Sequence, residues 1–375
     1  MLWTTGLTWP LMFGVQMLCA RIGLATGQGL AAALKRKIPR VVLILILVAL
    51  TLANIVNIGA DLSGMADAAQ MMTGIHRQWI APVFAVIIIF LTIKFTYVQI
   101  ARVLKWLCLV LFAYVVTAIL VVDDWGPILR DFFVPSWPRN SQDWSSIVAI
   151  LGTTISPYLF FWQASEEVEE EKSAGRRKEV ARHGSSAEAI KCRRIDVLVG
   201  TFFSNLIMCF IMVTAVATLH RQGITQIHSS QEAAAALKPL AGSFATTLYT
   251  AGLLGVGFLA IPTLASASAY ALAETFRRRQ GLSQHFGDAK TFYLIIAISV
   301  ALGAVLSCSP VNPMRVLFFS SVVNGVLAPF LLVGIVLVAM DRKLMNGQPV
   351  SRLMQGLAWV AAAIMAAAAV GMFAL

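Results

Sequence analysis

About ten long apolar segments, separated by short polar connections, dominate this sequence. Hydrophobic residues make up 58% of the chain and charged residues only 13%. A helix needs about 20 mostly apolar residues to cross a bilayer. The segments are residues 2–19, 41–62, 81–99, 104–122, 146–164, 196–218, 245–272, 291–308, 316–339 and 354–374. We therefore predict an all-α, multi-pass integral membrane protein with a single transmembrane domain over residues 1–375.

The basic residues indicate how the segments are oriented. The net charge is +11, but Lys and Arg are concentrated in alternate connections, which argues against a surface that binds nucleic acid. They lie mainly at residues 21–40, 94–105, 172–194, 277–290 and 342–352. Because basic connections remain on the cytoplasmic side, both ends of the chain are predicted to lie outside.

Two connections differ from the others in composition. Residues 165–195 begin with a run of glutamates and then become basic, which is typical of a solvated cytoplasmic loop that is partly helical or disordered. Residues 123–145 contain Trp125, Trp137 and Trp144 together with several prolines. Tryptophan is enriched at membrane surfaces, so we predict an external loop anchored at the interface.

The fifth segment carries a proline in the middle of apolar sequence. Residues 152–165 read Gly-Thr-Thr-Ile-Ser-Pro-Tyr-Leu-Phe-Phe-Trp-Gln-Ala-Ser. Proline removes one helical hydrogen bond, and within a bilayer the freed groups are tolerated only inside protein or beside a polar cavity. The hydroxyls of Thr153, Ser156 and Tyr158 lie near the carbonyls that Pro157 leaves unpaired, an arrangement that can bind an ion. The alternative is a simple proline kink packed against its neighbours.

Polar residues inside two other segments add candidates. Asn54, Asn57 and Asp61 recur at a spacing that places them on one face of a helix. Ionisable groups in a membrane segment usually mark an ion or proton pathway, whereas asparagines also join helices by hydrogen bonds. Both interpretations remain open for these residues. Ser321 and Asn324 lie in the ninth segment, where small polar residues serve as ligands or as packing surface.

No motif of a soluble enzyme competes with this interpretation. The sequence has no P-loop and no GxGxxG, GxSxG or HExxH motif, and no histidine lies within a predicted membrane segment. We therefore predict neither enzymatic activity nor a cofactor.

Four stretches of the sequence carry a family resemblance: Ala20–Gly27, Asn57–Leu62, Gly152–Tyr158 and Ala273–Phe276. Together they resemble the natural resistance-associated macrophage protein (NRAMP) family of divalent metal transporters. The resemblance implies a LeuT-like fold, in which two inverted five-helix repeats have their first and sixth helices broken around the ion. It also implies alternating-access transport of a divalent cation, here across a bacterial cytoplasmic membrane.

The same resemblance aligns the first segment with the family's second helix and the Pro157 segment with its sixth. The family's first helix, with its Asp-Pro motif, has no counterpart, and the predicted external N-terminus agrees with this. We therefore expect an inverted-repeat bundle that is missing its first helix. The implied metal contacts are Thr153, Ser156, Tyr158, Ser321 and Asn324, and the implied proton or ion pathway consists of Asn54, Asn57, Asp61 and Gln163.

Departures from the family pattern bear on the choice of ion. Ser156-Pro157-Tyr158 stands where the family usually has Met-Pro-His, so oxygen ligands replace a thioether and an imidazole. Such surroundings favour harder cations such as Mg²⁺ or Mn²⁺. Gln163 and Gly64 replace a histidine and an acidic residue that are associated with proton movement, which argues against tight proton coupling, although Asp61 remains a candidate proton acceptor.

Three functions are compatible with the sequence. The favoured one is a secondary transporter for a divalent metal of the manganese, magnesium or iron class. An amino-acid or amine permease on the same fold is the second, and a truncated membrane protein without transport activity is the third.

Overall fold

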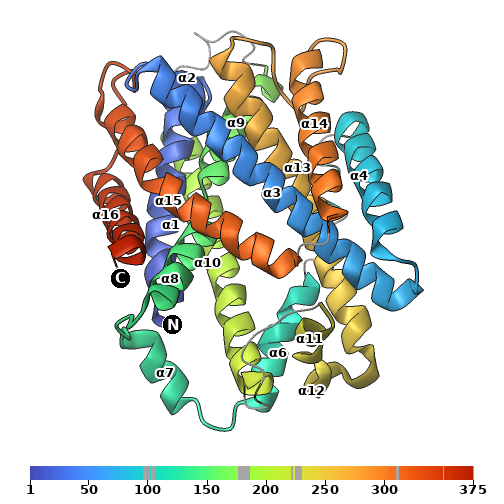
Figure 1. Cartoon of the computed structure of the whole chain (residues 1–375). Helices are drawn as coiled ribbons and strands as arrows, with labels where there is room; N and C mark the ends of the chain where they lie inside the picture. Colours follow the sequence, from blue (N-terminus) through green and yellow to red (C-terminus); the bar gives the residue numbers. More distant parts are fainter. Residues whose placement is uncertain are drawn as a thin grey trace.

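The computed structural model describes residues 1–95, 99, 102, 106–107, 109–175, 186–220, 223, 230–309, 312–348 and 350–374. Every regular element in these ranges is a helix (Figure 1). The α-helices are α1 (Trp3–Thr26), α2 (Leu30–Leu34), α3 (Arg40–Thr73), α4 (Arg77–Lys94), α6 (Phe112–Val121), α7 (Gly126–Phe133), α8 (Ser141–Thr154), α9 (Pro157–Ser173), α10 (Ala187–Thr218), α11 (Ser230–Ala235), α12 (Lys238–Ala241), α13 (Ala245–Thr275), α14 (Lys290–Ser307), α15 (Pro313–Met340) and α16 (Arg352–Ala374). The short 3₁₀ helices η1 (Leu109–Leu111) and η4 (Gly242–Phe244) precede α6 and α13.

Nine spans within the described ranges are long and apolar enough to cross a membrane. They are α1, α3, α4, α8 together with α9, α10, α12 together with α13, α14, α15 and α16. The predicted segment 104–122 is described as an apolar helix from Leu109 to Val121, and its first residues lie outside the described ranges. The prediction of an all-α, multi-pass membrane protein is confirmed.

Helix α3 runs obliquely through the bundle (Figure 1) and packs against α13, α14 and α15. One apolar core joins α1, α8, α9, α15 and α16 around residues such as Leu18, Phe161 and Leu331. A second core joins α3, α13 and α14 around Ile58, Ile261 and Phe292. Helix α9 contributes Phe161 to the first core and Trp162 to the second. It therefore lies where the two halves of the bundle meet.

Large apolar side chains cover much of the outer surface. Val41 on α3, Val86 on α4 and Val370 on α16 are each at least 66% exposed. A protein in water rarely leaves so much apolar surface uncovered. These side chains therefore face the lipid.

The stretch 165–195 is partly helical, as predicted, but its first residues are not solvated. Helix α9 continues to Ser173 and α10 begins at Ala187, so much of this stretch is helical. Glu167 and Glu169 are buried, with 1% and 7% exposure. They can be buried because cationic partners neutralise them, as described below. The expected external loop at 123–145 contains α7 and the first turn of α8, whose start is capped by the side chain of Asn140.

An ion pair joins two of the basic connections. Lys37, between α2 and α3, lies 2.6 Å from Asp341 at the end of α15. The hydrogen bond from Lys37 lowers the pKa of Asp341 to about 2. This carboxylate therefore stays charged at neutral pH, although such partly exposed pairs add little stability.

Candidate functional site

The membrane span made of α8 and α9 is interrupted at its centre. Helix α8 ends at Thr154, and α9 begins at Pro157. Between them, Ile155 has φ −101° and ψ 59°, and Ser156 has φ −77° and ψ 132°, so neither is helical. A proline disfavours helical backbone in the residue before it, and proline is well suited to the first position of a new helix. The local sequence therefore accounts for the end of one helix and the start of the next.

The hydroxyl of Ser156 covers the carbonyls exposed by this break. It donates to the carbonyl oxygen of Gly152 at 2.7 Å and to that of Thr153 at 2.8 Å. In a continuous helix the Thr153 carbonyl would accept from the N–H of residue 157, which proline lacks. Ser156 is only 1% exposed, and its hydroxyl takes the place of that donor. Because one hydroxyl proton is shared by two carbonyls, both oxygens keep lone pairs that could bind a cation.

Helix α15 touches the backbone of α8 beside the break. A Cβ atom on Gly152 would lie 2.1 Å from the carbonyl oxygen of Ser321 and 2.4 Å from the nitrogen of Gly325. Only glycine permits this approach. The contact brings Ser321 next to the end of α8, where its hydroxyl donates to the Leu317 carbonyl of its own helix at 2.8 Å.

Asn324 lies between the two helices that α15 contacts here. Ser320 faces α3, where its hydroxyl donates to Oδ1 of Asn57, and Ser321 and Gly325 face α8. With 3.6 residues per turn, Asn324 projects between these directions. It is 2% exposed, and its Oδ1 atom accepts no hydrogen bond from any described residue. This buried oxygen is a candidate ligand.

The polar face of α3 contacts two different helices. Asn54 is fully buried and donates to the Ser268 hydroxyl at 2.9 Å and to the Leu264 carbonyl at 3.3 Å, both on α13. Asn57 accepts from Ser320 on α15, as noted above. Both asparagines therefore join helices in this structure. Asp61 is half-buried and lies one turn beyond Asn57 on the same helix.

The remaining predicted residues are divided between the break and the basic side. The Thr153 side chain is exposed and Tyr158 is half-buried, and both flank Ser156. Gln163 donates to Oε1 of Glu167 at 2.8 Å, away from the break. The structure thus places Ser321 against the end of α8, directs Asn324 between α3 and α8, and joins Asn57 to Ser320. It assigns Gln163 to a different polar cluster.

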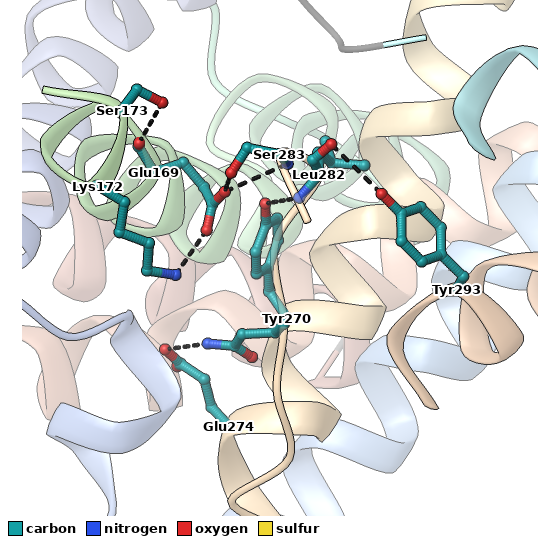
Figure 2. A network of polar contacts seen from close by, with 9 residues as sticks. Glu169, Lys172, Ser173, Tyr270, Glu274, Leu282, Ser283 and Tyr293 are labelled. Atoms are coloured by element: carbon teal, nitrogen blue, oxygen red, sulfur yellow. Dashed lines mark hydrogen bonds and ion pairs between the residues drawn. The ribbon is translucent and has the colours of Figure 1, made fainter. Parts of the chain in front are cut away.

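That cluster surrounds Glu167 and Glu169, which the sequence had suggested were solvated. Glu167 pairs with Arg193 of α10 at 2.7 Å. Glu169 pairs with Lys172 at 2.7 Å and accepts hydrogen bonds from Ser283 in the α13–α14 connection (Figure 2). A signal for the length of α9 was available, because Ala164 and Val168 repeat the spacing of Phe160 at four residues and continue the helical apolar pattern beyond Trp162. It did not indicate the partners of the two glutamates.

The groups available as metal ligands restrict how a metal ion could be bound. Among the residues that the structure describes, no three His, Cys, Asp or Glu side chains lie close enough to hold a metal ion. The break therefore offers hydroxyl, amide and backbone carbonyl oxygens. Oxygen atoms of this kind suit hard cations.

Comparison with known proteins identifies the family. The family described as "Natural resistance-associated macrophage protein-like" (Nramp) matches residues 1–375. The chain belongs to the Nramp family. A relative of this Nramp protein, the divalent metal cation transporter MntH of Mesorhizobium japonicum, is 26% identical over 360 residues, which cover 93% of this chain and 76% of the relative. MntH of Klebsiella pneumoniae is 24% identical over 356 residues, covering 93% of this chain and 80% of the relative.

Solved structures share the fold of this Nramp protein. The manganese transporter of Eremococcus coleocola aligns with a TM-score of 0.73 and 16% sequence identity, covering 98% of this chain and 78% of the transporter. The predicted fold class is therefore confirmed as that of Nramp transporters.

Proposed function

We propose that this protein is a secondary transporter that moves a divalent metal cation by alternating access across a bacterial cytoplasmic membrane. The observation that carries this proposal is the break between α8 and α9, buried within an Nramp-family bundle. A broken spanning helix leaves carbonyl groups and helix ends that can interact with an ion at the centre of the membrane. The names of the MntH relatives and of the manganese transporter support the choice of a metal cation.

In this proposal the ion is bound where α8, α9 and α15 meet. The Thr153 carbonyl and the Ser156 hydroxyl supply ligands from the break, and Ser321 or Asn324 supplies a ligand from α15. Tyr158 contributes its hydroxyl from the first turn of α9. Because these donors are all oxygens, we propose Mn²⁺ or Mg²⁺ ahead of softer metals, with Fe²⁺ as a further candidate.

We also propose that proton movement is not tightly coupled to the metal. Asn54, Asn57 and Asp61 lie along one face of α3, and Asp61 is the proposed proton acceptor on this path. Gln163 cannot titrate as a histidine would, and it is engaged with Glu167. A transmembrane pH gradient should therefore change the initial rate of metal flux by less than about twofold.

Metal flux into proteoliposomes tests the transport proposal. Vesicles containing the purified protein and a Mn²⁺-sensitive dye should show Mn²⁺ entry, and excess Mg²⁺ should slow it by competition. Asn324→Ala should lower the flux about tenfold, since it removes a buried ligand to a charged species. Asn205→Ala is the matched control, because Asn205 is also buried and its side chain bonds to Thr8 of α1 and Thr201 of α10.

Two outcomes would contradict this function. The first is the absence of both metal flux and metal-dependent thermal stabilisation in the wild-type protein. The second is uptake of amino acids or amines with no effect of added metal, which would select the permease. Equal losses of flux in the Asn324 and Asn205 variants, measured per folded protein, would reject the proposed ligand on α15.

A further inference from the structure

Two buried glutamates hold the end of α9 that lies farthest from the break. Glu167 is contacted by Arg193 at 2.7 Å and by Gln163 at 2.8 Å. Glu169, 7% exposed, is contacted by Lys172 at 2.7 Å and by both the hydroxyl and the N–H of Ser283. The first carboxylate ties α9 to α10, and the second ties it to the α13–α14 connection.

The segment that receives Glu169 is itself fixed by two tyrosines. The N–H of Leu282 donates to the Tyr270 hydroxyl of α13 at 3.2 Å, and its carbonyl accepts from the Tyr293 hydroxyl of α14 at 3.3 Å. Tyr293 also donates to the Gln284 carbonyl at 2.8 Å. Figure 2 shows that Glu169 reaches across from α9 to this segment. Residues 280–284 therefore form a rigid receptor for the carboxylate, which we call the 280–284 receptor.

Glycine at position 281 makes this close approach possible. Gly281 has φ +140°, a conformation that other residues rarely adopt. A Cβ atom there would lie 2.5 Å from Oε1 of Glu169. The 280–284 receptor thus has room for the Glu169 carboxylate because residue 281 has no side chain, and Ser283 holds the carboxylate by hydrogen bonds.

Stability alone does not explain two carboxylates buried within one turn of α9. Buried ion pairs are often no more stable than apolar residues of the same volume, because both charges lose their hydration. What such groups can supply is a defined position, since each bond forms in only one arrangement. Helix α9 needs this, because the interruption at Ser156 leaves it without continuous helical hydrogen bonds to α8.

We propose that Glu169 is a positioning residue for transport. Its carboxylate latches α9 to the 280–284 receptor, and release of this latch allows α9 to move relative to α13 and α14. The inference rests on the proposed alternating-access function, in which the half-helix beyond the break changes position. Contacts of charged groups at the membrane surface suit this role, because water can replace them when the latch opens.

A distance measurement tests the latch without any metal. Spin labels are attached to Ala174→Cys at the end of α9 and Lys290→Cys at the start of α14, in a background in which Cys108, Cys192, Cys209 and Cys308 are replaced by serine. The wild-type protein should give one dominant distance. In Glu169→Gln, the population at longer distance should rise roughly tenfold, because a charge-assisted hydrogen bond is lost.

Gly281→Ala releases the latch by a second, independent change, because the added methyl displaces the Glu169 carboxylate. It should produce the same longer distance as Glu169→Gln. Gly347→Ala is its matched control, since Gly347 also has a positive φ, +72°, and nothing lies within 4 Å of an added Cβ. Glu188→Gln is the control for charge, because Glu188 is an exposed carboxylate on α10. Both controls should retain the wild-type distance.

The outcomes separate the latch from a purely structural role. A lower melting temperature with an unchanged distance distribution in the folded Glu169→Gln and Gly281→Ala proteins would overturn the proposal. If Glu169→Gln does not fold, the distance in Gly281→Ala decides alone. Absence of wild-type metal flux would contradict the proposed function but would leave this distance test intact, so the two failures are distinguishable.

Discussion

Pro157 and Pro262 both lie in buried parts of membrane spans, yet only Pro157 interrupts its helix. Helix α13 continues from Ala245 to Thr275 with Pro262 inside it. Proline is also accommodated within α1, α4 and α15, at Pro10, Pro82 and Pro329. A proline in a membrane helix therefore permits a break without requiring one.

The neighbouring residues account for the difference. Ser156 precedes Pro157, and its hydroxyl replaces the missing backbone donor for two carbonyls. Ile261 precedes Pro262 and has no such group, so leaving the helical conformation there would expose unpaired carbonyls in an apolar core. Gly152 also lets α15 approach the broken end closely. A break in lipid thus requires a local donor and a closely packed neighbour as well as the proline.

The largest effect is expected from Gly152→Ala. The added methyl would meet backbone atoms of Ser321 and Gly325, which cannot move unless α15 moves. We expect the free energy of unfolding to fall by about 3 kcal/mol and metal flux to be lost. Gly200→Ala is the control, because nothing lies within 4 Å of a Cβ at that position. Unfolding in mixed micelles and flux in proteoliposomes measure both effects, and wild-type flux in Gly152→Ala would show that close packing is not needed.

Exchanging the two prolines for alanine tests the contrast directly. Pro157→Ala should allow α8 and α9 to join, because residue 157 regains its N–H. We expect flux to fall about tenfold while thermal stability is retained or raised. Pro262→Ala should keep wild-type flux, since α13 is already continuous. Similar losses of flux in both variants would contradict the special role of Pro157.

Removing the hydroxyl beside each proline should lower the free energy of unfolding by different, smaller amounts. Ser156→Ala leaves the Gly152 and Thr153 carbonyls without the hydroxyl donor and should lower the free energy of unfolding by about 2 kcal/mol. Thr263→Val removes a bond to the Leu259 carbonyl, but that carbonyl still has its helical N–H partner, so the loss should be below about 1 kcal/mol. Denaturant titration of both proteins measures the difference, and equal values would argue against the capping role of Ser156.

The smallest effects concern the two polar contacts of α3. Ser320→Ala removes the hydrogen bond to Asn57 beside the break, and Ser268→Ala removes the bond from Asn54 on the Pro262 side. Each should lower stability by about 1 kcal/mol. Only Ser320→Ala should also reduce flux, by a few-fold, because it borders the proposed ion site. Flux is measured per folded protein. Wild-type flux in both variants would contradict the position of Ser320 beside the proposed ion site.

Some of these features could be predicted from local sequence, and others could not. The membrane spans follow from runs of apolar residues, because in lipid a helix forms all of its backbone hydrogen bonds within itself. The candidate residues at 153–158 were indicated by the same local reasoning, since the carbonyls affected by Pro157 lie within one turn of it. The roles of these residues in ion binding stay predictions.

The burial of Glu167 and Glu169 could not be predicted in this way. Their partners, Arg193 and Ser283, are 26 and 114 residues away along the chain. A run of glutamates followed by basic residues usually indicates a solvated segment. Lys172 and Gln163 are local partners, but only the packing of α9 against α10 and the α13–α14 connection brings Arg193 and Ser283 to these carboxylates.

The amino-acid sequence alone therefore determined that this protein lies in a lipid bilayer, where its spanning helices are, and where one of them can be interrupted. All of these depend on interactions between residues close together in the chain. The tertiary structure decided that α15 packs closely against the end of α8, that the Asn324 side chain is buried between α3 and α8, and that two glutamates are buried. Each of these depends on which distant groups meet the side chain, because a buried polar atom is tolerated only where a partner is present.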